Sequence, residues 1–267
     1  MRMLKIRWFI FIAILSVNQA AFGQNIDHEL WGKLLNKNII SDNGGRSTQV
    51  DYDAMMNDRK IIKDYLDTLS TVSENEFYKW SKQDQLAFLI NAYNASTVEL
   101  VLTGWPNLKS IKELGGWFSS PWEVEFVSLL GKTRSLDDIE HNLIRGSGRY
   151  NDPRIHFAVN CASIGCPALR AEAYIGSKLD EQLREQTNLF LSDQRRNRVE
   201  SSTIQLSSIF KWYREDFERG WKGFDRLEEF LLAHADEMAI TAPIAQKLKL
   251  GKAKIEFMDY NWRLNEK

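Results

Sequence analysis

The sequence is poor in cysteine, histidine and proline, and it has no excess of basic residues. Two cysteines, four histidines and five prolines occur among 267 residues, and 35 basic residues face 36 acidic ones. One pair of cysteines cannot form a zinc knuckle built from two cysteine pairs, and a chain without a basic excess lacks the electrostatic footprint of a nucleic-acid-binding protein. The sequence also has no internal repeat, low-complexity tract or linker rich in proline and glycine. These absences predict a single continuous domain that binds no nucleic acid.

The first 23 residues have the layout of a secretory signal peptide. A positively charged start, residues 1–7, precedes the apolar run 8–17, and the small residues Ala21 and Gly23 form a cleavage site. The apolar run is shorter than the roughly 20 residues that span a bilayer. We therefore expect a signal peptide at 1–23 and one globular domain at 24–267, secreted and periplasmic, with no stable membrane insertion after cleavage. A retained N-terminal anchor is the alternative.

Two segments have the patterning of helices. Apolar residues recur at helical spacing over residues 54–69. The segment DQLAFLINAYNASTVELVLT, residues 84–103, is apolar almost all round, which is typical of a helix buried on every side. It carries Asn91 and Asn94 on one side, and buried amides need hydrogen-bond partners. These two side chains are expected to hold either the backbone of a neighbouring loop or a ligand.

A third helix is expected over SLDDIEHNLIR, residues 135–145, and it places a glutamate on its apolar face. Glu140 falls between apolar positions, whereas His141 and Arg145 lie on an adjacent stripe. An inward glutamate is unfavourable unless it is paired or hydrogen-bonded. Glu140 is therefore a candidate general base, metal ligand or partner of a buried arginine, for which Arg154 is the obvious candidate.

The segment RIHFAVN, residues 154–160, alternates as a strand does. One face would carry apolar residues, and the other would carry Arg154, His156 and Asn160. Cys161 follows at the end of this expected strand, where α/β proteins commonly place chemistry. A helix is expected next, over residues 171–191. The polar face beside a cysteine predicts a site for catalysis or for ligand binding.

Three interpretations of the two cysteines are open. In an oxidising compartment, Cys161 and Cys166 most simply form a disulfide that closes a tight loop. In the second interpretation Cys161 is a nucleophile, with His156 or His141 as its base. In that case Glu140, Asp137 or Asn160 would orient the imidazole, and Ser163 is a weaker candidate nucleophile. The third is a metal site made by Glu140, His141, His156 and a cysteine.

Several motifs, in this order, resemble the family called domain of unknown function 547. They are VDYDAMMNDRKIIKDYLDTLS, AFLINAYNA, SLDDIEHNLIR, DPRIHFAVNCASIGCPALRAEAY, LSSIFKWYREDF and DYNWRLNE. The resemblance runs from about residue 50 to residue 266, and it implies a shared fold and shared site residues without implying an activity. The residues at its motif positions are Asn91, Tyr93, Asn94, Glu140, His141, Arg145, His156, Asn160, Cys161, Ser163 and Cys166.

The last third of the chain favours more helices and one returning strand. Helices are expected over residues 207–217 and 224–238, and a strand over 254–262 is expected beside the strand at 154–160. Trp212 and Tyr213 are expected to fill the core rather than to line a cleft. The expected fold class is α+β, a single compact domain with several helices packed on a small, mostly antiparallel sheet.

The expected function is a cysteine- or histidine-dependent hydrolase or acyl transferase that acts on peptide-like or envelope substrates. The alternative is a non-catalytic envelope binding or assembly module with a structural Cys161–Cys166 disulfide. Its partner would be a small-molecule, peptide or envelope ligand, and no metal or cofactor is expected. Replacing His156 by alanine is expected to abolish turnover and to leave the melting temperature nearly unchanged. The catalytic candidates are Cys161, His156, His141 and Glu140. The substrate-binding candidates are Asn91, Asn94, Arg145, Arg154, Asn160 and Ser163.

Overall fold

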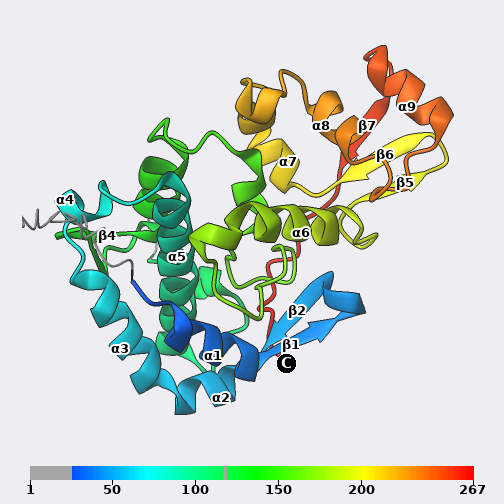
Figure 1. Ribbon diagram of the computed structural model, residues 1–267. Coiled ribbons are helices and arrows are strands. Elements are labelled where there is room, and N and C mark those ends of the chain that lie inside the picture. Colours follow the sequence, from blue (N-terminus) through cyan, green and yellow to red (C-terminus); the bar gives the residue numbers. More distant parts are fainter. Residues whose placement is uncertain (1–25, 117–118) are drawn as a thin grey trace, which may run out of the picture.

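One long buried helix, α5 (Lys82–Gly104), is the centre of the fold (Figure 1). The computed structural model describes residues 26–116 and 119–267, so the expected signal peptide lies outside the described residues. Every residue of α5 from Gln85 to Leu102 is buried, which confirms the helix predicted from its all-round apolar pattern. Its N-terminus is capped by Ser81, whose side chain accepts a hydrogen bond from the backbone N–H of Asp84.

The composition of α5 is also that of a membrane span. By length and composition it could cross a membrane, although the mature sequence was expected to contain no such segment. In the fold, 94% of its apolar window is buried inside the protein. The helix is therefore accounted for as the core helix of this domain.

The N-terminal elements pack around α5 and form the first of two hydrophobic clusters. The helix predicted over residues 54–69 is present as α2 and α3, which meet at Asp58, the residue that ends one and begins the other. The helices are α1 (Glu29–Asn38), α2 (Tyr52–Asn57), α3 (Arg59–Ser70) and α4 (Glu74–Phe77). Two antiparallel hairpins accompany them, β1 (Ile39–Asp42) with β2 (Ser47–Val50) and β3 (Val127–Leu129) with β4 (Lys132–Arg134).

The C-terminal elements form the second hydrophobic cluster, on the side of α6 (Leu179–Leu191) away from α5 (Figure 1). Its three-stranded sheet has the order β5 (Arg198–Glu200), β6 (Thr203–Leu206), β7 (Lys254–Phe257). The helices of this part are α7 (Ile209–Trp212), α8 (Leu227–Ala233) and α9 (Ala242–Lys249). The helix expected over 207–217 is therefore split, because α7 is followed by a 3-10 turn, Arg214–Phe217.

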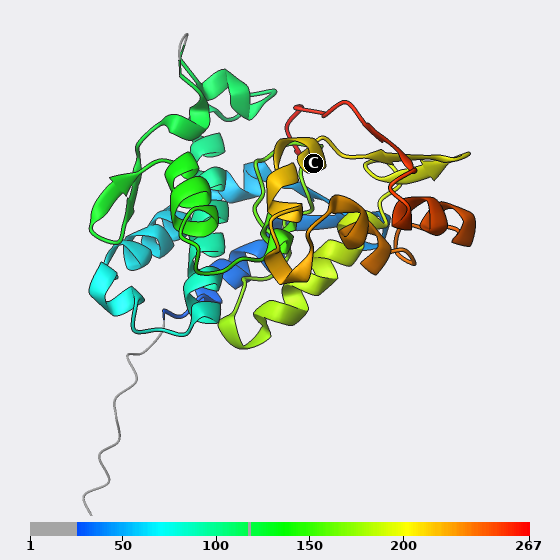
Figure 2. The same ribbon diagram turned by 90° about the horizontal axis from the view of Figure 1, so that it is seen from above.

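The C-terminal segment joins the two clusters. Strand β7 pairs in parallel with β6, so the expectation that it lies beside residues 154–160 is wrong. After β7 the chain returns to the first cluster, where Leu264 bridges to Ser163 and Glu266 bridges to Val50. Figure 2 shows this red segment crossing over the middle of the molecule. The α+β class is confirmed, with three small sheets among the described residues in place of one.

The expected strand at residues 154–160 is wrong: the structure has a 3-10 helix, Pro153–Phe157. Ile155 packs in the first hydrophobic cluster and Phe157 in the second. The segment runs between the two clusters, and His156 is buried as well. Burial of successive residues against two different clusters produces the same alternation of apolar residues as a half-buried strand. The sequence pattern therefore predicted the burial of Ile155 and Phe157 correctly. The strand and its solvent-facing polar side are wrong, because His156 and Asn160 are buried too.

The helix expected over 171–191 begins only at Leu179, because the preceding residues are held against α5. Asn91 donates to the carbonyl of Tyr174 (2.8 Å) and accepts from its N–H (2.9 Å). A Cβ on Gly176 would collide with the side chain of Asp84, so glycine permits the close approach. Residues 171–178 therefore form a loop and a short 3-10 turn rather than the start of α6.

Asn94 holds the loop after His156 in the same way. Its amide donates to the carbonyl of Ala158 (3.0 Å) and accepts from the N–H of Asn160 (2.8 Å). Both Asn91 and Asn94 are buried and act as a strand partner would, by satisfying one donor and one acceptor of the backbone. Of the two predicted alternatives, the structure has the amides holding loop backbone.

We predict that Asn94→Ala lowers the free energy of unfolding by about 2–4 kcal/mol, because it leaves a buried carbonyl and a buried N–H without partners. Urea unfolding with an unchanged m-value measures this. Asn142→Ala is the matched control, since its amide is exposed and bonds only Asp138; it should change stability by less than about 0.5 kcal/mol. Equal effects of the two substitutions would contradict the holding role of Asn94.

Candidate functional site

A pocket of about 190 Å³ lies between the two hydrophobic clusters. It brings together all four catalytic candidates, because Cys161, His156, His141 and Glu140 line it. Helix α5 contributes Tyr93 to its wall, and residues around α7 contribute aromatic side chains. The substrate-binding candidates do not line it within the described residues. Their roles in binding therefore remain predictions, and the structure places each of them elsewhere.

His156 is buried at the wall of this pocket and is paired with a carboxylate. Its Nε2 lies 2.7 Å from Oδ2 of Asp216, and its ring stacks on that of Tyr213 with centroids 4.0 Å apart. An ionised carboxylate only accepts hydrogen bonds, so Nε2 donates and Nδ1 presents its lone pair. Nδ1 is buried and has no hydrogen-bond partner. Burial lowers the pKa of His156, and the hydrogen bond to Asp216 opposes that shift.

Asp216 is the centre of a buried charge cluster. Arg145 donates from Nε to the same Oδ2 (2.5 Å), and Arg219 forms an ion pair with Oδ1 (2.6 Å). Burial alone would raise the pKa of Asp216, but the hydrogen bonds from His156 and Arg145 outweigh it and lower the pKa to about 2. The carboxylate therefore stays ionised throughout the range in which proteins are stable.

His141 lies on the other side of Arg145. Arg145 donates from Nη1 to Nδ1 of His141 (2.8 Å), so in the neutral ring the proton sits on Nε2, 3.7 Å from Asp137. Burial raises the pKa of Asp137, the charge of Glu140 adds to this shift, and that of His141 opposes it. Glu140, His141 and Arg145 belong to a π-helix, Asp138–Arg145, in place of the expected α-helix, and Asp137 directly precedes it. π-Helical turns occur frequently at functional sites.

Glu140 is buried, but the expectation that it pairs with Arg154 is wrong. Arg154 forms ion pairs with Asp152 (2.7 Å) and Asp180 (2.6 Å), outside the pocket. Oε1 of Glu140 is buried and has no hydrogen-bond partner. The 3-10 conformation of residues 153–157 explains the difference, because it turns Arg154 toward α6 rather than toward the π-helix.

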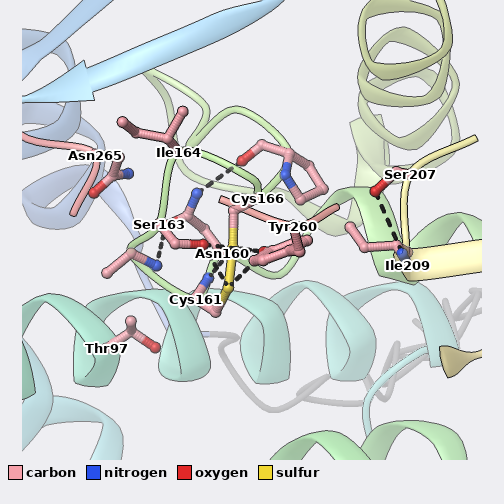
Figure 3. The surroundings of a disulfide bond; sticks show 12 residues. Thr97, Asn160, Cys161, Ser163, Ile164, Cys166, Ser207, Ile209, Tyr260 and Asn265 are labelled. Atoms are coloured by element: carbon pink, nitrogen blue, oxygen red, sulfur yellow. Dashed lines mark hydrogen bonds between the residues drawn. A yellow bond between two sulfur atoms is a disulfide. The ribbon is translucent and has the colours of Figure 1, made fainter. Parts of the chain in front are cut away.

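Cys161 and Cys166 form a disulfide, so the first interpretation of the pair is confirmed (Figure 3). The hydroxyl of Tyr260 lies 3.1 Å from Sγ of Cys161 and 3.2 Å from Sγ of Cys166. It also bonds Oγ of Ser163 (3.0 Å). A Cβ on Gly165 would come within 2.8 Å of the Tyr260 ring, so only glycine allows this packing. The tyrosine thus closes over the disulfide loop.

Asn160 shapes the same loop from inside. Its amide donates to the carbonyl of Pro167 (2.7 Å) and accepts from the N–H of Ala162 (2.9 Å). The loop is therefore held by a side-chain amide at its base as well as by the disulfide. Across residues 26–116 and 119–267, no group of three or more His, Cys, Asp or Glu side chains is placed to hold a metal ion. The metal-site interpretation gains no support from that part of the chain.

Aromatic side chains line the pocket, and the expectation that Trp212 fills the core is wrong, whereas Tyr213 both packs against the second hydrophobic cluster and lines the pocket. Trp212 is 47% exposed and, like Tyr213, lines the pocket. Its ring stacks on Trp262 with centroids 5.6 Å apart and lies 4.8 Å from that of Tyr260. Trp122 meets Trp262 edge-on at 5.6 Å. The pocket is therefore entered through a rim of aromatic side chains.

The family comparison covers the central part of this site. Residues 77–191 match the family described as "Protein of unknown function, DUF547". The resemblance is confirmed over this range, which is narrower than the expected extent of 50–266. The DUF547 region contains Glu140, His141, His156 and the disulfide, whereas Asp216 and the aromatic residues Trp212, Tyr213, Tyr260 and Trp262 lie beyond it. No curated protein and no solved structure matches the chain.

The most important residue that sequence reasoning missed is Asp216. It lies 60 residues after His156, and no local pattern connects the two. A signal was present in the motif YREDF, because Asp216 falls at helical spacing three residues after Tyr213 and directly before the apolar Phe217. An acid on the buried side of a turn carries the same implication as Glu140: it needs a cationic or donating partner.

We predict that Asp216→Asn lowers the free energy of unfolding by about 3–5 kcal/mol, because it leaves the buried charge of Arg145 without its partner. Chemical denaturation measures the effect. Glu215→Gln, one position earlier on the exposed side, is the control and should stay within about 0.5 kcal/mol of the wild type. If Asp216→Asn changes the free energy of unfolding as little as this control does, the charges around Asp216 do not stabilise the contact between the two hydrophobic clusters.

We further predict an acid-labile contribution from Asp216. Its pKa is lowered from 3.8 to about 2 by folding, so between these values the unfolded chain binds more protons than the folded chain. The stability that Asp216 provides is therefore present above pH 4 and is lost as the pH falls toward 2. Unfolding measured at a series of pH values should show this loss in the wild type and a smaller one in Asp216→Asn. Identical pH profiles of the wild type and Asp216→Asn would contradict the conclusion that Asp216 is the source of this loss.

Proposed function

We propose that the pocket is the active site of a hydrolase or acyl transferase that acts on peptide-like substrates. In this proposal Cys161, after its disulfide is opened, is the nucleophile and His156 is its base. The observation that carries the proposal is that His156 and Cys161 line the same pocket, while His156 is bonded through Nε2 to Asp216 and its Nδ1 has no hydrogen-bond partner. A base oriented by a carboxylate beside a nucleophile is the arrangement of the catalytic triads.

The chemistry starts with reduction of the disulfide. A dithiol reductant exchanges with the Cys161–Cys166 bond, becomes a disulfide itself and leaves two protein thiols. His156 then takes the proton of the Cys161 thiol, and the thiolate attacks the carbonyl carbon of the substrate. The imidazolium returns that proton to the leaving group, and a thioester forms. Water or an acceptor amine attacks the thioester, which releases the acyl group and restores the thiol.

Three properties of the site fit these steps. The lowered pKa of His156 keeps the ring neutral at neutral pH, where it can accept a proton. The pKa of Asp216, about 2, keeps the carboxylate ionised so that it can orient and stabilise the imidazolium. Burial raises the pKa of Tyr260, so its hydroxyl stays protonated beside the Cys161 sulfur and can donate to a thiolate or to an oxyanion.

The second candidate is a binding or assembly module that performs no catalysis, and the closed disulfide favours it. If the Cys161–Cys166 disulfide has only a structural role, no pocket needs to reach His156, whereas an enzyme requires a pocket that does. The pocket that reaches His156 therefore supports the enzyme more than the clip. We also propose that the protein is exported, since the leader-like residues 1–23 and the disulfide both fit an oxidising compartment. Activity there would depend on a dithiol reductant delivered to that compartment.

The expectation that His156→Ala abolishes turnover and leaves the melting temperature nearly unchanged cannot be tested with alanine, so a different substitution is needed. His156 is buried and bonds Asp216, so alanine would leave a cavity and an unpaired carboxylate and would lower stability as well as activity. His156→Gln retains most of the volume and keeps an amide donor for Asp216. It removes the basic nitrogen, so it separates the loss of catalysis from the loss of folding.

We predict that Cys166→Ser protein, which holds Cys161 as a free thiol, is acetylated on Cys161 by p-nitrophenyl acetate. Intact mass and peptide mapping detect the adduct. Adding His156→Gln should slow acetylation about 100-fold or more, because it removes the general base. The wild type should react only after reduction. Absence of an adduct on Cys161, or acetylation that is equally fast with His156→Gln, would contradict acyl transfer and leave the binding module.

A further inference from the structure

Glu140 is a buried carboxylate that the proposed mechanism does not use. Its residue is 5% exposed and lines the pocket. Burial and the charge of this carboxylate raise the pKa of Tyr93 and Tyr213, whose hydroxyls lie beside it, but no hydrogen bond reaches Oε1 of Glu140. A buried charge is unfavourable unless it is paired or hydrogen-bonded. The amides of Asn160 and Asn94 near this site each bond a backbone donor and a backbone acceptor, whereas Oε1 of Glu140 and Nδ1 of His156 bond neither. An unpaired carboxylate oxygen at a pocket wall is therefore a feature that a ligand would complete.

The charges around Glu140 favour a cationic ligand. Asp137, one turn earlier, is a second carboxylate on the pocket wall. Among the described residues that line the pocket there is no lysine or arginine. Arg145 does not line the pocket and is engaged by Asp216 and His141. The pocket thus holds two carboxylates and neither a lysine nor an arginine to neutralise them. The imidazole of His141 faces Asp137 at 3.7 Å, which leaves Glu140 as the carboxylate available to a cation.

The shape and the walls of the pocket fit the end of an alkyl chain that carries an ammonium group. At about 190 Å³ the pocket is smaller than the roughly 300–1,000 Å³ of sites that enclose a drug-sized ligand, so it takes one side chain or a chain end. Tyr93, Tyr213 and Trp212 line it, and aromatic faces attract cations and pack against methylene groups. The remainder of a longer substrate would then lie outside, across the exposed Trp212 and its neighbour Trp262.

We propose that Glu140 is the receptor for a primary ammonium group of the substrate, so that the pocket selects a peptide-like substrate with a lysine-type side chain or a free amino terminus. The inference rests on the proposed function, since it names the substrate class of the same site. Oε1 of Glu140 accepts a charge-assisted hydrogen bond from the ammonium, which stays protonated and serves as an anchor. The ammonium is a specificity group in this account, and the acyl group attacked by Cys161 belongs to another part of the substrate.

The test is calorimetric titration of the full-length protein with its disulfide closed, so that no turnover occurs. The probes are Nα-acetyl-lysine methylamide and its Nε-acetylated analogue, which has the same chain without the charge. We expect the amine to bind at least ten-fold more tightly than the neutral analogue, the advantage of a charge-assisted over a neutral contact. Glu140→Gln should weaken binding of the amine by roughly ten-fold to a hundred-fold. Glu181→Gln removes one exposed carboxylate on α6, away from the pocket, and should not change the affinity.

Equal affinities for the amine and the neutral analogue, or no binding of either, would overturn the inference. So would a Glu140→Gln protein that binds the amine as the wild type does. The comparison of the two probes uses wild-type protein, so it is decisive even if Glu140→Gln does not fold. Binding with the predicted selectivity but no acetylation of Cys161 would keep the ammonium receptor and remove acyl transfer. Acetylation of Cys161 without selectivity for the amine would keep acyl transfer and remove the ammonium receptor.

Discussion

The buried carboxylate of Asp216 links the turn after α7 to two side chains from earlier in the chain. Its Oδ2 accepts from both His156, in the 3-10 helix 153–157, and Arg145, at the end of the π-helix. Without these partners the carboxyl group would be driven toward its neutral form by burial. With them it holds a permanent negative charge inside the protein, and that charge fixes the tautomer and the orientation of His156. The pocket, the base and the contact between the clusters follow from this one arrangement.

The backbone around this charge is held by side chains rather than by regular secondary structure. Asn94 fixes residues 158–160 on α5, and Asn160 fixes the loop that carries the disulfide. Tyr260 closes over both sulfur atoms and is admitted by Gly165. A loop held at so many points presents Cys161 and its neighbours in one geometry. Preorganisation of this kind is what an active site or a selective pocket requires.

The sequence predicts the parts of the fold that one segment determines by itself. The buried helix α5 and the inward position of Glu140 are local patterns, and the structure has both. The disulfide was the simplest of three open interpretations of Cys161 and Cys166, and the structure has it as well. The sequence does not predict the 3-10 helix at 153–157, because its residues are buried by two clusters that meet only in the folded chain. For the same reason the sequence analysis predicts an ion pair between Arg154 and Glu140 that the structure lacks, and it misses Asp216. Partners that are 60 or more residues apart leave no trace in local periodicity.

The central claim is that the His156–Asp216 pair activates Cys161, and the reactivity of that thiol tests it without knowledge of the substrate. The measurement is the rate at which iodoacetamide alkylates Cys161 in Cys166→Ser protein as a function of pH, with and without His156→Gln. The account predicts an apparent pKa for Cys161 well below the ordinary thiol value of about 8.5, and a return toward that value with His156→Gln. An ordinary or raised pKa that is the same in both proteins would contradict it.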